Sequence, residues 1–327
     1  MRTKIAIMGA GMVGSYLYRL LCNAGYDNVT LFDTKHRSQT KCGIHPCAWG
    51  TSNGFHELVK AAGLDPEEYI LKKPEYLMMD EVKVKADLMS FDKPRLIGDL
   101  LRDTSITYST PDIGEYDRII DATGISRAYL PQIENDATLE CIQYKALRDL
   151  NREPLENRTK LGNIGYAWIF PLSGNSYHIG CGSFKAAPHI MLRQLGWLDD
   201  CVMVCGCVSM IRLTAPKGSL PFVHGNIWGV GESIGCVAPM AGDGIVPGMK
   251  SAQILLQNWD DPEEYTYAIL NEFAWMEDER LVIDKLRQGK TIGMKDALVL
   301  KKNSERMGME IGLKEAAMLM KRLLNDV

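Results

Sequence analysis

The sequence has no long apolar run and no block of charge of one sign. Its longest nearly uninterrupted apolar stretch, residues 201–211, is far shorter than the roughly 18 to 20 residues that span a bilayer. The net charge is −4, and Lys and Arg gather only in short clusters, so the charge pattern of a nucleic-acid-binding protein is missing. We therefore expect neither a transmembrane segment nor a nucleic-acid partner.

The sequence also lacks the patterns of a secreted or metal-binding protein. The residues ahead of the first glycine motif leave no room for a charged segment and an apolar segment, so we expect no secretory signal and a cytoplasmic location. Nine cysteines, an odd number at irregular spacings, favour reduced thiols over disulfides. Cys42-x2-His45-x-Cys47 has no second pair of ligands, so no metal site is expected.

A glycine motif stands near the N-terminus, Gly9-x-Gly11-x-Val13-Gly14. An apolar run at 4–8 precedes it as a short strand, and residues 15–24 follow with helical periodicity up to Gly25. The first glycine permits a tight turn, the second lets backbone N–H groups approach a pyrophosphate, and the third lets the helix pack on the strand. The pattern predicts a dinucleotide-binding turn, and a glycine turn that binds nothing is the alternative.

An acidic residue follows the second predicted strand. Residues 28–32 form that strand, and Asp33 comes directly after it, about 20 positions beyond the glycines. A carboxylate at this place accepts hydrogen bonds from an adenosine ribose. Strand, turn, helix, strand and acid in this order predict a Rossmann-type site.

A second glycine-rich segment, residues 227–252, lies some 220 residues further on. It resembles the strand, acid, loop and helix of the single-Rossmann flavoproteins that include para-hydroxybenzoate hydroxylase, whose P-x-x-G-x-G-I turn begins a helix. The matching positions are Glu232, Pro239, Gly242, Gly244 and Ile245. The resemblance implies FAD, with Glu232 in place of the aspartate that binds the ribityl chain. A helix that starts near Gly244 would direct free N–H groups at the flavin.

Two other segments resemble these flavoproteins. Residues 116–127 look like the family's strand and the Asp-Gly pair after it, with Gly124 in the glycine position and two residues between it and Asp121 in this chain. An ordinary buried strand is the alternative. Lys93 stands where the family has an arginine at the start of a flavin-contacting helix, and the alternative is a solvated lysine with Arg95 as the guanidinium.

An aromatic segment characterises the second half of the chain. Tyr166-x-Trp168-x-Phe170-Pro171 and the glycines that follow resemble the Y-x-W-x-F-P hairpin and G-x-G strand of the geranylgeranyl reductase family. Because side chains alternate along a strand, one face is aromatic and the other aliphatic. The resemblance implies that Tyr166, Trp168 and Phe170 bind an apolar substrate, and core packing is the alternative.

A cysteine is our candidate for the chemistry. Thr40-Lys-Cys42-Gly43 resembles the family's segment that passes close to the isoalloxazine, which implies that Cys42 and Gly43 contact the flavin. The Cys42 thiol would be the proton donor that completes alkene saturation, or else a buried and inert thiol. Three further cysteines, Cys201, Cys205 and Cys207, are expected to be buried as small apolar residues.

The predicted fold class is α/β. A Rossmann-type FAD-binding domain, residues 1–70, 90–130 and 225–260, is interleaved with a substrate-binding domain of mostly antiparallel sheet, residues 71–89 and 131–224. Residues 261–327 form a C-terminal helical cap, whose Met-Leu stripe at 313–324 is core packing, with loose contact to a lipid surface as the alternative.

The predicted function is that of an FAD-dependent oxidoreductase of lipid biosynthesis. It would reduce carbon-carbon double bonds of an isoprenoid or similar apolar substrate by hydride transfer from reduced flavin, as the resemblance implies. No second G-x-G-x-x-G unit is visible, so the electrons would come from a ferredoxin, a separate reductase or NAD(P)H. The alternatives are a flavin monooxygenase of the same fold and a flavin redox sensor or carrier without turnover.

Overall fold

A five-stranded sheet is built around the N-terminal strand. The structure is a computed structural model that describes residues 3–34, 49–102 and 104–325. The strand order is β14–β15–β8–β1–β2, and only β14 runs antiparallel to its neighbour. The strands are β1 (Ile5–Met8), β2 (Val29–Phe32), β8 (Arg118–Asp121), β14 (Val223–His224) and β15 (Ile227–Gly229). All four residues of β1 are buried, as expected for a parallel strand covered on both faces.

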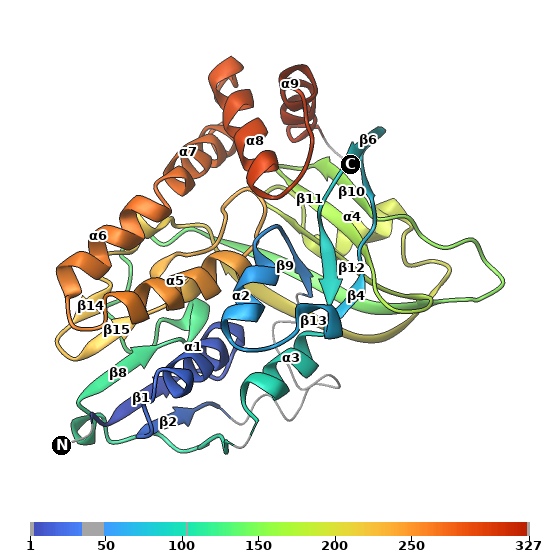
Figure 1. Ribbon diagram of the computed structural model, residues 1–327. Helices are drawn as coiled ribbons and strands as arrows, with labels where there is room; N and C mark the ends of the chain where they lie inside the picture. Colours follow the sequence, from blue (N-terminus) through green and yellow to red (C-terminus); the bar gives the residue numbers. More distant parts are fainter. Residues whose placement is uncertain (1–2, 35–48, 103, 326–327) are drawn as a thin grey trace.

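Helices from both ends of the sequence cover this sheet. The helix α1 (Met12–Asn23) packs against α5 (Ile245–Gln257) and α3 (Lys93–Leu100), and α2 (Phe55–Ala61) packs against α5 (Figure 1). The first helix begins at Met12, three residues before the predicted start at Ser15. The glycine turn is therefore shorter than expected, and Gly14 already lies inside the helix.

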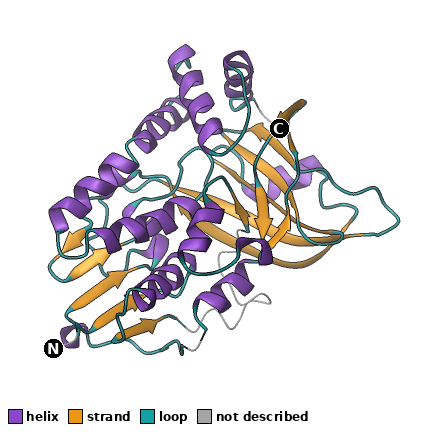
Figure 2. Ribbon diagram, in the orientation of Figure 1, coloured by secondary structure: helices purple, strands orange, loops and turns teal. Residues whose placement is uncertain are grey.

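A seven-stranded sheet forms the second layer, in the order β13–β9–β12–β11–β10–β5–β6. All pairs are antiparallel except β10 with β5. Its strands are β5 (Tyr76–Met79), β6 (Val82–Lys85), β9 (Thr138–Arg148), β10 (Arg158–Gly162), β11 (Gly165–Pro171), β12 (Ser176–Ser183) and β13 (Cys201–Arg212). Figure 2 shows the two sheets as separate groups of strands. Helix α4 (Pro188–Leu195) packs on β12 and β9.

Short elements connect the two sheets. A small three-stranded sheet consists of β3 (Gly50–Thr51), β7 (Met89–Phe91) and β4 (Ile70–Lys72). The single-turn 3-10 helices are η2 (Pro66–Glu68), η3 (Ile113–Glu115), η4 (Gly124–Ser126), η5 (Pro216–Ser219) and η6 (Gly231–Ile234). Two of these turns, η4 and η6, follow neighbouring parallel strands and therefore lie close together at one edge of the sheet.

The C-terminal helices bridge both sheets (Figure 1). They are α6 (Pro262–Glu272), α7 (Trp275–Arg287), α8 (Met294–Arg306) and α9 (Leu313–Arg322). Tyr265 and Ile269 of α6 belong to the core around the five-stranded sheet. Ala316 and Leu319 of α9 pack instead with Leu77 and Val84 of the seven-stranded sheet. The described elements confirm the predicted fold class, a Rossmann-type unit joined to a mostly antiparallel sheet and a helical cap.

The expectation that three cysteines are buried was wrong. Cys201, Cys205 and Cys207 are only partly buried, and Val202 between them is 70% exposed. The physical reason is that β13 is the edge strand of the seven-stranded sheet, so that within the sheet only β9 pairs with it. This apolar run thus forms an edge strand that is partly exposed, and not a buried central strand.

Candidate functional site

The glycine turn has the close approaches that its sequence predicts. Gly9 has φ of 106°, and a Cβ added there would lie 2.4 Å from the Ala122 carbonyl oxygen. A Cβ at Gly14 would lie 1.9 Å from the Gly9 carbonyl oxygen. Gly11 is the residue directly before α1, which has no side-chain cap, so the first N–H groups of the helix have no side-chain acceptor at that position. This is the arrangement that binds phosphate at a helix N-terminus.

Asp33 lies beside this turn. One carboxylate oxygen, Oδ2, accepts a hydrogen bond from the Ala10 N–H at 3.1 Å, and Oδ1 accepts one from the Thr34 N–H at 2.7 Å. The side chain therefore lies between the end of β2 and the glycine turn, the position expected for a ribose contact.

The second glycine-rich segment packs directly on the first helix. A Cβ at Gly231 would lie 3.0 Å from Cγ2 of Val13, and one at Gly248 would lie 2.6 Å from the same atom. Val13 therefore fills the gap between α1 and the segments around η6 and α5. Glycines at 231 and 248 allow these three elements to meet.

Glu232 and Gly124 come together at the ends of β15 and β8. A Cβ at Gly124 would lie 3.3 Å from Oε2 of Glu232, and Oε1 accepts a hydrogen bond from the Arg212 backbone N–H at 2.8 Å. Burial raises the pKa of the Glu232 carboxyl, and the backbone hydrogen bond from Arg212 partly opposes this rise. The carboxylate thus lies at the shared edge of two strands, beside the glycine that the sequence pattern singled out.

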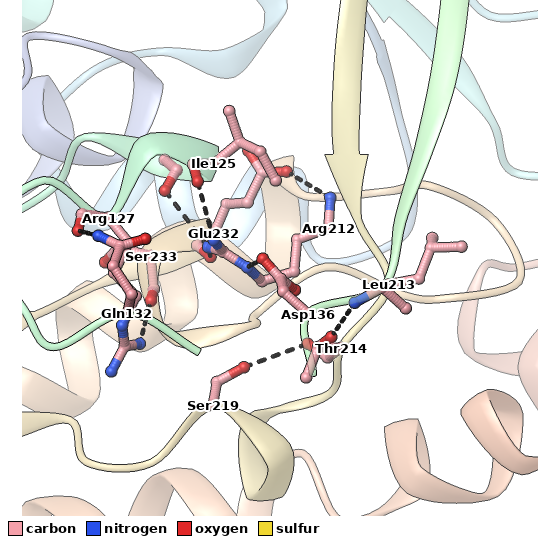
Figure 3. A network of polar contacts seen from close by, with 12 residues as sticks. Ile125, Arg127, Gln132, Asp136, Arg212, Leu213, Thr214, Ser219, Glu232 and Ser233 are labelled. Atoms are coloured by element: carbon pink, nitrogen blue, oxygen red, sulfur yellow. Dashed lines mark hydrogen bonds and ion pairs between the residues drawn. The ribbon is translucent and has the colours of Figure 1, made fainter. Parts of the chain in front are cut away.

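A buried arginine holds these two strand ends together (Figure 3). Arg212, at the end of β13, is 2% exposed. Its Nε donates to Asp136 at 2.9 Å, and Nη2 donates to the Ile125 carbonyl at 2.8 Å. Its Nη1 donates to the carbonyls of Gly124, at 3.4 Å, and Glu232. One guanidinium therefore connects the seven-stranded sheet to both strand ends of the Rossmann unit.

A second buried arginine lies next to the first. Arg127 has φ of 41° and donates to the Pro131 carbonyl at 2.6 Å and the Pro221 carbonyl at 2.7 Å, and also to the Ser233 carbonyl. Burial, together with the nearby Arg212 charge, lowers the pKa of Arg127 to about 10. These hydrogen bonds tie the loop after β8 to the segments that contain Pro221 and Ser233.

The start of α5 carries a carboxylate that sequence reasoning did not single out. Gly242 has φ of 66°, and the Asp243 Oδ1 accepts the Ile245 N–H at 3.0 Å. The Ser52 hydroxyl donates to Asp243 Oδ2 at 2.6 Å. Burial raises the pKa of Asp243, while these hydrogen bonds oppose the rise. Gly244 precedes the helix, as the glycine-rich turn predicted.

The remaining predicted cofactor residues have different placements. Lys93 is the first residue of α3 and is buried. Arg95 is half-exposed and donates to Glu68 at 2.6 Å, so its guanidinium has a surface partner. Cys42 and Gly43 lie outside the described residues, as do His45 and Cys47.

An apolar pocket of about 60 Å³ lies between the seven-stranded sheet and the cap. Tyr166 and Trp168 line it from β11, whereas Ala167 and Ile169 on the opposite face pack with α4. The pocket is also lined by Leu139, Cys141, Ile164, Gly165, Gly182, Phe184, Ile211, Leu213, Pro239, Met240, Gly242, Ile283, Leu286 and Leu323. No charged side chain is among these described lining residues.

The aromatic residues of β11 divide between two places. The Tyr166 and Trp168 rings are 5.6 Å apart, and the Trp168 Nε1 donates to Gln143 at 3.0 Å. Phe170 is not a lining residue of the pocket, since its ring lies against Gly50, where an added Cβ would be 3.0 Å from Cε2. The Tyr166 hydroxyl donates to the Ala241 carbonyl, which joins the pocket to the turn before α5.

Among the described residues there is neither a cluster of metal ligands nor a helix that could span a membrane. No group of three or more His, Cys, Asp or Glu side chains among them is arranged to hold a metal ion. Within the same part of the chain, no helix combines the length and the apolar character needed to cross a membrane.

Comparison with known proteins decides the fold. A geranylgeranyl bacteriochlorophyll reductase-like protein from Thermoplasma acidophilum matches with a TM-score of 0.72 at 15% identity, over 97% of this chain and 95% of that chain. The p-nitrophenol 4-monooxygenase of Pseudomonas putida matches with a TM-score of 0.65 at 11% identity, over 98% and 97%. The chain has the single-Rossmann flavoprotein fold. The resemblance to the geranylgeranyl reductase family is thereby confirmed at the level of the fold.

Sequence comparison adds a relative without a described activity. An uncharacterized protein of Methanocaldococcus jannaschii is 25% identical in an alignment that covers 86% of this chain and 91% of that protein. No protein-family model matches the chain.

Proposed function

We propose that this chain binds FAD where its glycine turn, the end of β8 and the start of α5 converge. The contacts of Gly9 with Ala122, of Val13 with Gly231 and of Gly124 with Glu232 support a single site formed by segments far apart in the sequence. The residues proposed to contact FAD are Gly9, Gly11, Val13, Gly14, Asp33, Lys93, Gly124, Glu232, Gly242, Gly244 and Ile245, together with Cys42 and Gly43 outside the described residues.

We further propose that the chain reduces carbon-carbon double bonds of an isoprenoid or similar apolar molecule. The observation that carries this proposal is the connection between the apolar pocket and the turn before α5. Gly242 lines the pocket, and the Tyr166 hydroxyl holds the Ala241 carbonyl. A substrate beside Tyr166 and Trp168 would therefore be next to the proposed flavin segment. A lining without charged side chains favours an apolar ligand.

The reaction requires a hydride and a proton. When bound, reduced flavin supplies the hydride to one alkene carbon. The chain must supply the proton for the other carbon, and Cys42 remains our candidate donor. Within the pocket, burial raises the pKa of the Cys141 thiol to about 12, so that thiol is neutral at pH 7. The electrons come from an external donor, for which a ferredoxin, a reductase and NAD(P)H are the candidates.

The free thiols fit a reducing compartment. The described cysteines include no disulfide, and Cys141, Cys181 and Cys236 are buried. Persistent free cysteines are typical of the cytoplasm, which is the location that we propose.

A flavin monooxygenase is the second candidate function. The reductase-like protein and the nitrophenol monooxygenase match this chain with similar TM-scores. Because one fold can serve both kinds of reaction, the fold does not distinguish a reductase from a monooxygenase. A monooxygenase would consume oxygen and hydroxylate its substrate, whereas an alkene reductase would work without oxygen.

Anaerobic reoxidation of the dithionite-reduced protein tests the proposal. Prenyl diphosphates and prenyl ethers are added, and flavin absorbance is followed, with the saturated analogues as the control. We expect the alkenes to accelerate reoxidation and the saturated analogues to have no effect. Indifference to every alkene would overturn the reductase, and oxygen-dependent hydroxylation would establish the monooxygenase. Tight FAD binding without any reoxidation by substrate would indicate a sensor or carrier.

The same assay tests Cys42 as the proton donor. Cys42→Ser should keep its flavin and reduce alkenes at least tenfold more slowly, because general acid catalysis contributes on the order of 10² or more. Cys22→Ser, on the exposed surface of α1, is the matched control and should keep the full rate. Equal rates in both variants would assign Cys42 a structural role.

A further inference from the structure

The last part of the C-terminal cap, residues 285–325, is basic in a chain that is acidic overall. Residues 285–325 contain ten Lys and Arg against four Asp and Glu, a net charge of +6, while the whole chain has −4. The excess cations therefore lie on α8, α9 and the segments beside them. Such a local concentration of positive charge attracts an anionic partner.

A groove between α7 and α8 gathers part of this charge. It is lined by Trp275, Asp278, Lys295, Leu298, Val299, Lys302 and Arg306. Three cations thus share the groove with one carboxylate. Among the residues that the structure describes, neither Lys295 nor Lys302 has an ion-pair partner, whereas the Arg306 guanidinium lies over the Trp275 ring at 4.5 Å. The two lysines are therefore available to a ligand.

Apolar side chains are exposed on the same helices. Met294 and Leu298 of α8 are 62% and 42% exposed, and Leu281 of α7 and Met318 of α9 are also exposed. Residues four apart lie on one face of a helix, so Met294, Leu298 and Lys302 form a single stripe along α8. Cations and aliphatic side chains therefore lie on the same surface of α8. This is the composition of helices that lie in a membrane interface.

We propose that the α7–α8 groove and the exposed stripe of α8 rest on an anionic lipid surface. The lysines would pair with lipid phosphates while Met294 and Leu298 enter the boundary between headgroups and acyl chains. A nucleic acid would match the charge of the groove but would leave these aliphatic side chains in water. The observations therefore favour a lipid surface.

The same cap closes the apolar pocket. Ile283 and Leu286 of α7 line the pocket, and Trp275 of the same helix lines the groove. Eight residues of α-helix separate Trp275 from Ile283, a rise of about 12 Å. An apolar molecule dissolved in the bilayer would thus have a short path to the pocket. The inference goes beyond the proposed reaction, and it can be tested without turnover.

Sedimentation with sucrose-loaded vesicles tests the surface, with the FAD-loaded protein of all 327 residues. We expect binding to vesicles of phosphatidylcholine with phosphatidylglycerol, little binding to phosphatidylcholine alone, and release at high salt. The double variant Lys295→Glu/Lys302→Glu should weaken this binding by about tenfold or more. The matched control Lys60→Glu/Lys72→Glu changes the net charge equally at exposed positions outside the cap and should bind within about twofold of the wild type.

Further measurements distinguish binding to a lipid surface from binding to other anionic ligands. Leu298→Ser should weaken binding to the anionic vesicles severalfold, and an unchanged affinity would contradict the entry of α8 into the lipid boundary. An equal loss in the two charge-reversal variants would overturn the assignment to the groove. Binding of inorganic phosphate or of double-stranded RNA, without binding to the anionic vesicles, would overturn the proposal. A thermal-unfolding midpoint and flavin spectrum like those of the wild type show that each variant is folded.

Discussion

At the scale of single residues, the glycine turn has the least tolerance for change. The contact between Gly14 and the Gly9 carbonyl leaves no room for even one methyl group, because 1.9 Å is far inside van der Waals distance. The turn must move if any side chain is placed at position 14. The same turn presents its N–H groups to the proposed phosphate. Stability and FAD binding should therefore both depend on the close approach of Gly14 to the Gly9 carbonyl oxygen.

Gly14→Ala should therefore lose FAD and stability together. We expect a decrease of about 2 kcal/mol or more in the free energy of unfolding, from overpacking, and protein purified without yellow colour. Urea unfolding and the flavin spectrum measure the two effects. Gly98→Ala in α3 is the control, since its Cβ would meet nothing within 4 Å, and it should be neutral or stabilise by about 0.5 to 1 kcal/mol. Full yellow occupancy in Gly14→Ala would contradict the phosphate assignment.

The sequence alone was informative for glycines and much less so for buried charges. Glycine spacing reports a local backbone requirement, so Gly9 and Gly14 were identified without any tertiary knowledge. Arg212 and Asp243 act through partners up to 191 residues away, as with Ser52 and Asp243, and no local pattern contains such contacts. Arg212 had one weak signal, a single charge at the end of the apolar run 201–211.

At the scale of elements, Arg212 makes β13 part of the Rossmann site. Its guanidinium and backbone N–H hold the turn after β8 and Glu232 after β15, so the end of a strand of the seven-stranded sheet fixes two segments of the proposed FAD site. Removing this planar set of donors leaves buried carbonyls and the Asp136 carboxylate without their partner. The loss of these contacts should therefore lower the free energy of unfolding and displace Glu232.

Arg212→Lys should keep the charge but lose this arrangement. We expect the free energy of unfolding to fall by about 2 to 4 kcal/mol and FAD to bind at least tenfold more weakly. Urea unfolding with and without FAD, and flavin fluorescence titration, give the two values. Arg95→Lys, on the surface beside Glu68, should stay within about 1 kcal/mol of the wild type. Equal effects in the two variants would show that Arg212 contributes no more than a surface ion pair such as that of Arg95 with Glu68.

Elements with strong periodicity were predicted well. The strand β1 and the helix α9 lie where the apolar spacing placed them, and α5 begins where the resemblance of its glycine-rich turn implied. The failure at β13 has a general cause, since an apolar run specifies a strand but does not specify its neighbours. Whether a strand lies at the edge or in the centre of a sheet is decided by the strand order. For β13 that order depends on pairing with β9, some 60 residues earlier in the sequence.

At the scale of the whole molecule, a buried carboxyl connects folding to pH. Glu279 of α7 is 0% exposed, its Oε2 accepts the Met240 N–H at 3.2 Å, and Arg306 lies 4.0 Å from Oε1. Burial raises the pKa of Glu279 from 4.5 to about 8. Its neighbours on the same face of the helix, Met276 and Ile283, are apolar. An acidic residue within this apolar stripe was the feature of the sequence that could have indicated a buried carboxyl.

The sign of the pH dependence follows from the raised pKa. Between pH 4.5 and pH 8 the folded chain keeps the proton on Glu279 and the unfolded chain releases it, so this contribution to stability is complete below about pH 4.5 and is lost as the pH rises through 8. Between pH 5 and pH 8, the wild type should therefore lose about 2 to 4 kcal/mol relative to Glu279→Gln. Urea unfolding across this range measures the difference. The exposed Glu153→Gln should follow the wild type, and parallel curves for wild type and Glu279→Gln would contradict the buried, protonated state.

The strand order has a consequence for biosynthesis. In the five-stranded sheet, β1 pairs with β8, and β8 needs β15, whose residues follow β1 by more than 200 positions. At a translation speed of about 5 to 20 residues per second, the first strand leaves the ribosome roughly 10 to 45 seconds before its sheet can close. For about the first half of that interval, until β8 is made, the nascent Ile5–Met8 segment can pair only with β2, and for the rest of it β8 lacks its partner β15, so an unpaired parallel strand is open to aggregation throughout.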